Sequence, residues 1–167
     1  DTASPNLTVL HQDARRALID LDPAVRFDVV FGDAFHDIAV PAHLVTREFH
    51  RELAARMTPD GFYALNVIDL GTDPRFLMSL VRTLRQDFPV VEVWKTVGEI
   101  EDTGRVTFII VAGKEASPVD RLASLRGLAR SWARWSPEEL DRRIAASDVP
   151  VLTDDFAPVE RLLSNLL

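Results

Sequence analysis

Two carboxylates, Asp33 and Asp37, follow a short apolar run at residues 29–31. The run is typical of a strand buried on both faces, and a carboxylate is costly to bury there without a partner. A carboxylate that accepts a proton or a hydrogen bond from an ammonium group prepares the amine for nucleophilic attack. We therefore predict that Asp33 and Asp37 hold a cationic substrate and that Asp33 orients its amine. The alternative is that Asp33 caps a turn and that Asp37 is solvated.

Other acidic residues stand at the ends of predicted strands and helices. Asp13 opens a predicted helix, where it is either an ordinary N-cap or an acceptor for an exocyclic amine such as that of adenine. Asp154 and Asp155 form a second acidic pair. This pair either makes local capping and turn contacts or closes over the site.

The sequence predicts neither a metal site nor a phosphate-binding loop. It contains no cysteine, and the spacing of its four histidines matches no metal-ligand pattern. Its seven glycines include no pair separated by a single residue, so it has no G-x-G loop.

Alternating apolar runs and helical patterns indicate a single α/β domain. Strand–helix alternation implies a mostly parallel sheet with right-handed crossovers, in which ligands bind outside the carboxyl ends of the strands. The polar residues Asp13, Asp33, Asn66 and Asp69 follow or close these strands. The sequence predicts strands at 7–11, 27–31 and 62–67, helices at 13–21, 46–57 and 73–87, an antiparallel hairpin of strands at 90–96 and 105–113, and helices at about 118–132 and 137–146.

Composition limits the possible functions. The formal net charge of −7 argues against a protein that binds duplex nucleic acid, because phosphate contacts need a clustered basic surface. No apolar run is long enough to span a membrane, and the N-terminal residues resemble neither a signal peptide nor a transit peptide. We expect a soluble, cytoplasmic domain with a small-molecule partner.

The stretch FDVVFGDAFHDIAVPAHLVTREFHRELAARMTPDGFYALNV, residues 27–67, resembles part of the spermidine synthase-like family. These polyamine aminopropyltransferases have the class I S-adenosylmethionine (SAM) methyltransferase fold. The stretch has the family's order of strand, acidic loop, proline, L-x-T-x-E-F helix, PDG turn and strand. VLHQDARRAL is similar to the family's adenine-contacting strand end, and LTDDFAPVE to the C-terminal signature of its actinobacterial and membrane-fused branches. The resemblance covers residues 7–113 and 151–160.

The resemblance implies a three-layer Rossmann-like fold and a transferase. The reaction implied is transfer of an aminopropyl group from decarboxylated SAM to an amine such as putrescine, without a metal. Asp33 matches the family's catalytic aspartate, and Asp13 with the backbone of Ala14 matches its adenine contact. We assign Asp37, Asp154 and Asp155 to substrate binding. The alternatives are a small-molecule methyltransferase that uses SAM itself and a non-catalytic binding domain.

Two features depart from the family pattern. The family's Asp-Ser/Thr-x-Asp-Pro motif is replaced by Asp33 through Asp37, which is one residue longer and has no proline, and Tyr63 is the only tyrosine. Family members also begin with a β-hairpin domain, which is followed by two strands, the first with a glycine loop. In the family's sheet these two strands lie between the strands that match residues 7–11 and 27–31. We therefore expect residues 1–167 to be a partial domain, completed by a preceding segment or by another chain, with a homodimer as one possibility. The alternative is that the strands at 7–11 and 27–31 pair directly.

Overall fold

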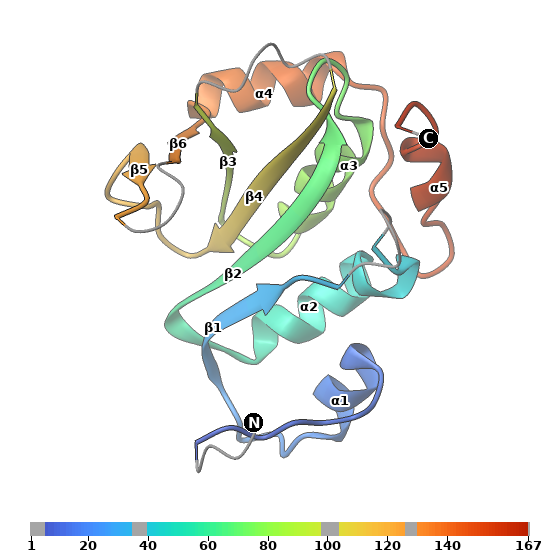
Figure 1. Ribbon diagram of the computed structural model, residues 1–167. Coiled ribbons are helices and arrows are strands. Elements are labelled where there is room, and N and C mark those ends of the chain that lie inside the picture. Colours follow the sequence, from blue (N-terminus) through green and yellow to red (C-terminus); the bar gives the residue numbers. More distant parts are fainter. Residues whose placement is uncertain (1–5, 35–39, 98–103, 126–129, 167) are drawn as a thin grey trace.

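A six-stranded sheet in the order β1-β2-β4-β3-β6-β5 forms the centre of the structure (Figure 1). The structure is a computed structural model that describes residues 6–34, 40–97, 104–125 and 130–166. The strands are β1 (Phe27–Gly32), β2 (Met57–Leu70), β3 (Val90–Thr96), β4 (Arg105–Gly113), β5 (Arg121–Ala123) and β6 (Ser131–Arg134). The helices are α1 (Ala14–Asp20), the short 3-10 helix η1 (Ala42–Leu44), α2 (Arg47–Ala55), α3 (Arg75–Leu84), α4 (Pro137–Ala146) and α5 (Val159–Leu162).

The sheet is mixed, which corrects the expectation of a mostly parallel one. Among the described ladders the β1–β2 pairing is parallel, whereas the other four are antiparallel. The reason is that β4 lies between β2 and β3 and runs antiparallel to both. Strands β1, β2 and β3 consequently run in the same direction. Their carboxyl ends point toward the same edge of the sheet, which we call the rim. β2 extends beyond the end of β1, where Gly32 pairs with Leu65.

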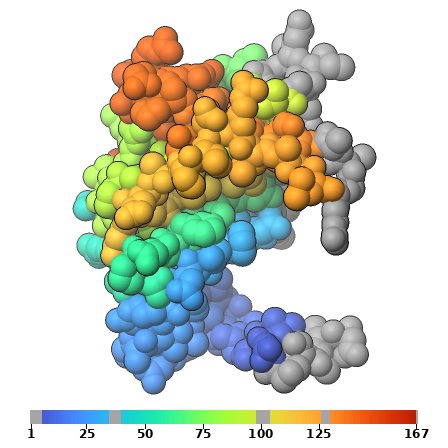
Figure 2. All heavy atoms as spheres, turned by 90° about the vertical axis from the view of Figure 1, so that its left-hand side faces the viewer, coloured from blue at the N-terminus to red at the C-terminus, as the bar shows by residue number. Residues whose placement is uncertain are grey.

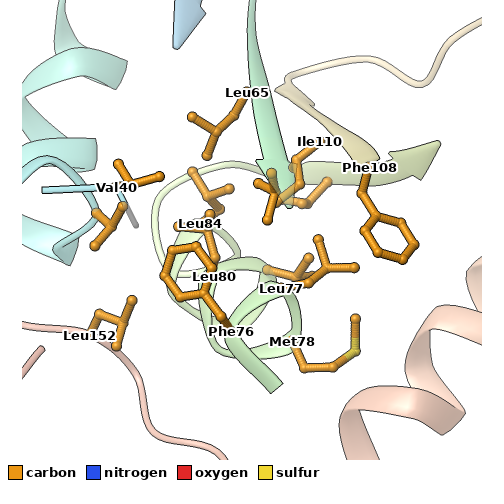
Figure 3. Close-up of a cluster of buried hydrophobic side chains, with 14 of the residues drawn as sticks. Val40, Leu65, Phe76, Leu77, Met78, Leu80, Leu84, Phe108, Ile110 and Leu152 are labelled. Carbon is orange, nitrogen blue, oxygen red and sulfur yellow. The ribbon is translucent and has the colours of Figure 1, made fainter. Parts of the chain in front are cut away.

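Helices pack against one face of the sheet. Tyr63, Leu65 and Val67 alternate along β2 and are at most 3% exposed, because alternate residues of a strand point to the same face. They join the main apolar core, which contains side chains of α2 and α3 and extends to Leu152 (Figure 3). Each such aliphatic or aromatic side chain contributes about 1.5–3 kcal/mol when it is buried.

The opposite face is open over part of the sheet. Phe62 is 38% exposed and Phe31 is 76% exposed. The helices that contribute to the core all lie on the other face, so the third layer expected from the sequence is not formed by the described residues.

Residues 7–11 do not form the predicted strand. Leu7, Val9 and Leu10 are about half exposed, at 53%, 48% and 50%. A strand needs a neighbour that accepts and donates its backbone hydrogen bonds, and β1 pairs with β2 in the described part of the chain. The expected alternative, direct pairing of residues 7–11 with residues 27–31, is therefore wrong for this structure.

Residues 118–132 contribute short strands, not the predicted helix. Strand β6 pairs with β3, and β5 pairs with β6. The carboxylate of Glu92 in β3 is 6% exposed and accepts hydrogen bonds from the Arg134 guanidinium and from both the backbone and the hydroxyl of Ser117. This buried ion pair and the backbone pairing of β6 with β3 hold the segment in the sheet.

Candidate functional site

Asp33 lies at the rim, directly after β1. Asn66 in β2 donates a hydrogen bond from Nδ2 to Asp33 Oδ1 over 2.9 Å. The other amide atom, Asn66 Oδ1, is buried and has no hydrogen-bond partner among the described residues. A buried acceptor without a donor is costly, so the pair has spare acceptor capacity at Asn66 Oδ1 and Asp33 Oδ2.

A hollow of about 520 Å³ opens beside this pair, and we call it the rim hollow. Its polar groups come from the ends of β1 and β3, from within β2 and β4, and from the residue before β6. The polar side chains that line it are Asp33, Asn66, Thr96, Thr107 and Arg130. Phe31, Ile109 and Trp132 form apolar parts of its wall.

A second hollow, of about 570 Å³, separates α1 from β1, and we call it the α1–β1 hollow. It is lined mainly by apolar side chains, and Ala14, Asp33 and Tyr63 are among its lining residues. In Figure 2 an opening separates the dark-blue N-terminal residues from the lighter-blue part of the chain above them. Asp33 lines both hollows, so the structure brings together Asp33 and Ala14, two residues that the sequence assigned to one site.

Gly32, which precedes Asp33, is required by packing against β2. A Cβ atom at this position would lie 2.5 Å from Leu65 Cδ1 and 2.6 Å from Tyr63 Oη. Both neighbours are nearly fully buried, at 2% and 3% exposure. Burial also raises the pKa of the Tyr63 phenol well above its ordinary value.

We predict that Gly32→Ala lowers the free energy of unfolding by about 1–3 kcal/mol, because an added methyl group overpacks a buried contact. Gly104→Ala is the matched control, since a Cβ atom there meets nothing within 4 Å. Urea unfolding of both variants measures the difference. Equal midpoints for the two variants would show that the Tyr63 and Leu65 side chains move aside without cost.

Asp13 is the N-cap of α1. Its carboxylate accepts a hydrogen bond from the backbone N–H of Arg16 over 2.9 Å, and Oδ2 lies 2.6 Å from Nε2 of His43. The pKa of Asp13 is held below its ordinary value, mainly by the hydrogen bond from the Arg16 backbone and, to a smaller extent, by the hydrogen bond with His43. Asp13 therefore fixes the start of the helix that presents Ala14 to the α1–β1 hollow.

Asp154 connects the C-terminal region to α1. Arg15 donates hydrogen bonds to both of its carboxylate oxygens, over 2.7 and 2.8 Å. The hydrogen bond from Arg15 lowers the pKa of Asp154 to about 2. Asp154 and Asp155 line neither hollow, and Asp37 lies outside the described residues.

We predict that Asp154→Asn costs about 1 kcal/mol or less at neutral pH, because the Asp154 side chain is 41% exposed and water screens the pair. The lowered pKa means that this contribution is present above pH 3.8 and is lost as the pH falls toward about 2. Asp155→Asn is the control. A thermal melt of each variant at pH 7 and pH 3 measures the effect, and an equal loss at both pH values would contradict the ion-pair origin.

The sequence alone assigns no role to several residues of the rim hollow. Asn66 stands at a predicted strand end without an assignment to the site, although its even spacing from Phe62 places both on one face of a strand. The sequence does not indicate that Arg130 and Trp132 line a site, because their segment has a helical pattern. Asp69 is expected at the rim, but it is buried and accepts hydrogen bonds from the backbone of Leu70 and Leu77, each over 2.8 Å.

The described residues contain no group of three or more histidine and acidic side chains that could hold a metal ion. No helix in the described ranges is long and apolar enough to span a bilayer.

Comparisons with known proteins give a fold but no sequence family. No protein-family model matches the sequence, and no curated protein matches it. A probable spermidine synthase from Corynebacterium glutamicum is 22% identical with a TM-score of 0.56, and the match covers 93% of this chain and 50% of that chain. Human methyltransferase-like protein 13, solved in complex with SAH, is 19% identical with a TM-score of 0.54, over 96% of this chain and 61% of that chain.

Spermidine synthase from Thermotoga maritima is 19% identical with a TM-score of 0.53, over 70% of this chain and 38% of that chain. The chain therefore spans between about two fifths and three fifths of the length of these structures. Identities this low establish the fold alone. The chain is an α/β protein with the fold shared by SAM methyltransferase-like proteins and spermidine synthases.

Proposed function

We propose that this chain is part of a spermidine synthase-like transferase in which Asp33 orients an acceptor amine in the rim hollow. The observation that carries the proposal is the pair of Asp33 and Asn66 beside the rim hollow. Their hydrogen bond of 2.9 Å uses Asp33 Oδ1 and leaves Asp33 Oδ2 as an acceptor, and the buried Asn66 Oδ1 has no partner among the described residues. Carboxylate and amide oxygens are suitable acceptors for an ammonium group. The fold shared with spermidine synthases supports a SAM-type donor.

The proposed donor is decarboxylated SAM. The amine nitrogen attacks the carbon next to the sulfonium, an N–C bond forms, and the C–S bond breaks with its electron pair remaining on sulfur as a neutral thioether. An ammonium nitrogen has no lone pair, so it must lose a proton before it attacks. We assign the acceptance of that proton to Asp33, and contact with the donor's adenine to Asp13 and Ala14.

The substrate-binding roles of Asp37, Asp154 and Asp155 remain part of the proposal. Asp154 is placed in the ion pair with Arg15, so its contribution would be indirect, through the position of α1. We likewise propose that a preceding segment or another chain completes the sheet beside β1, as a third layer and further strands would require.

The test is product formation by the full-length protein with decarboxylated SAM and putrescine. We expect spermidine and the thioether nucleoside in equal amounts. The absence of product above that of an enzyme-free blank would overturn the aminopropyltransferase assignment.

A methyltransferase is the second candidate, and Arg130 is the observation that favours it. A donor that keeps its carboxylate needs a cationic or amide partner near its amino-acid end, and Arg130 lines the rim hollow. Calorimetry with SAM and decarboxylated SAM discriminates between the candidates, because only the methyltransferase requires tighter binding of SAM. If the full-length protein binds neither nucleoside at millimolar concentration, the non-catalytic alternative becomes the best account.

A further inference from the structure

The rim hollow contains one group of each charge. Asp33 and Arg130 are its charged lining residues, and both are exposed. Within the described ranges neither side chain joins an ion pair. Two opposite charges that face one hollow without neutralising each other are available to a ligand that has both charges.

At the negatively charged end of the rim hollow, Asn66 lies beside Asp33. Asn66 donates one hydrogen bond to Asp33 and keeps a buried Oδ1 atom with no partner among the described residues. An unpartnered acceptor favours an N–H donor over a carboxylate, because two acceptors repel each other. The Asp33–Asn66 end therefore suits an ammonium group, and it disfavours an anion.

The end of the rim hollow at Arg130 favours an anion over a cation. A guanidinium presents a planar fork of N–H donors that matches the two oxygens of a carboxylate. A second ammonium group at this end would instead meet a like charge, which is unfavourable. Phe31, Ile109 and Trp132 provide apolar wall along the hollow, where the carbon chain of a ligand would lie.

We propose that the rim hollow binds a ligand with an ammonium group and a carboxylate group, the ammonium at Asp33 and Asn66 and the carboxylate at Arg130. This inference rests on the proposed role of Asp33 in holding an amine, and it narrows the ligand class. The ligand that fits this arrangement is an acceptor with its two charges at opposite ends of a carbon chain, that is, an ω-amino acid. A plain diamine is the poorer ligand for this hollow.

Calorimetric titration of the full-length protein with putrescine and with 4-aminobutyrate tests the proposal. The two ligands have the same chain length and differ in one terminal group. We expect 4-aminobutyrate to bind about tenfold more tightly, which is the order of one charge-assisted contact.

Two variants separate this inference from the proposed function. Arg130→Gln should remove the preference for the carboxylate and should not weaken putrescine, whose second ammonium group no longer meets a like charge. Arg121→Gln, an exposed arginine of β5 outside the hollow, should change neither affinity. Asp33→Asn should weaken every amine ligand of the hollow. If 4-aminobutyrate is not preferred over putrescine, or if the preference survives in Arg130→Gln, the inference is overturned. Putrescine binding that still depends on Asp33 would then leave the proposed function standing, and binding that ignores Asp33 would remove both.

Discussion

Asp33→Asn is expected to lower the rate of group transfer about 10²–10⁴-fold, the usual effect of removing a positioned proton acceptor. The substitution keeps the shape of the side chain but replaces a carboxylate by an amide, which cannot take a proton from an ammonium group. It also places a second side-chain amide opposite Asn66, where the native pair joins Asn66 Nδ2 to a carboxylate oxygen. The rate constant under saturating donor and acceptor, measured by discontinuous product assay, reports the effect.

The control for this variant is Asp148→Asn, because Asp148 is an exposed carboxylate that lines neither hollow and has no proposed role in binding. Its rate should equal that of the native protein. The affinity for the donor should be the same in all three proteins, because Asp13 and Ala14 are unchanged. A rate for Asp33→Asn within a factor of about two of the control would mean that proton transfer at Asp33 does not contribute to the reaction.

His50→Leu is expected to stabilise the protein by about 1–3 kcal/mol at neutral pH, because removing unsatisfied buried polar atoms recovers their desolvation cost. The His50 side chain is fully buried, and neither ring nitrogen has a hydrogen-bond partner in the described part of the chain. Its ring lies near those of Phe49 and Tyr63, with centroids 5.7 and 5.9 Å away. Leucine is an apolar side chain of similar size. Urea unfolding of the two proteins at pH 7 measures the gain.

The same histidine should make native stability fall in acid. Burial lowers the pKa of His50 from 6.5 to about 3. Between pH 6.5 and about 3 the unfolded chain binds a proton at His50 that the folded chain does not bind. The free energy of unfolding therefore decreases as the pH falls through this range. The slope is about 1.4 kcal/mol per pH unit within that window, which amounts to several kcal/mol.

Asp69 has the opposite effect on the pH dependence of stability, so the measurement must separate the two groups. Burial raises its pKa from 3.8 to about 6, so the folded chain holds the extra proton and stability falls as the pH rises through that range. The two groups therefore offset each other between about pH 4 and pH 6. The difference between the native protein and His50→Leu isolates the histidine. This difference should grow as the pH falls below 6.5, and a difference independent of pH would contradict the burial of a neutral His50.

Elements with local signals were predictable from the sequence. The strands predicted at 90–96 and 105–113 are β3 and β4 and pair as an antiparallel hairpin. The helix predicted at 46–57 corresponds to α2, and its N-cap Thr46 accepts a hydrogen bond from the backbone of Phe49. Capping residues and apolar periodicity lie within a few residues of the structure they specify, which explains these agreements.

Elements that depend on distant partners were not predictable. Residues 7–11 have the composition of a strand but lack a described neighbour to pair with. Residues 118–132 have a helical pattern, but the free edge of β3 and the buried ion pair between Glu92 and Arg134 hold part of them as strands. In both segments tertiary pairing determines the structure, and local propensity is only a weak preference against it.

In the candidate site, too, some features were predictable from the sequence and others depend on distant partners. That strand ends share a rim follows from the order of strands and helices, and it correctly places Asp33 near Asn66 and near the helix that presents Ala14. The ion pair between Arg15 and Asp154 joins residues 139 positions apart, and no local pattern indicates it. Arg130 enters the rim hollow only because the following residues pair with β3.

The side-chain amide signal of Asn66 in an NMR titration tests most directly whether Asp33 receives an amine. In the free protein Asn66 Nδ2 donates to Asp33 Oδ1 over 2.9 Å, so a bound ammonium group alters the amide's surroundings. Our account predicts a saturable shift of the Asn66 amide signals when putrescine or 4-aminobutyrate is added, and no such shift in Asp33→Asn. An Asn66 signal that stays in place while signals of residues outside the rim hollow move with the ligand would contradict it.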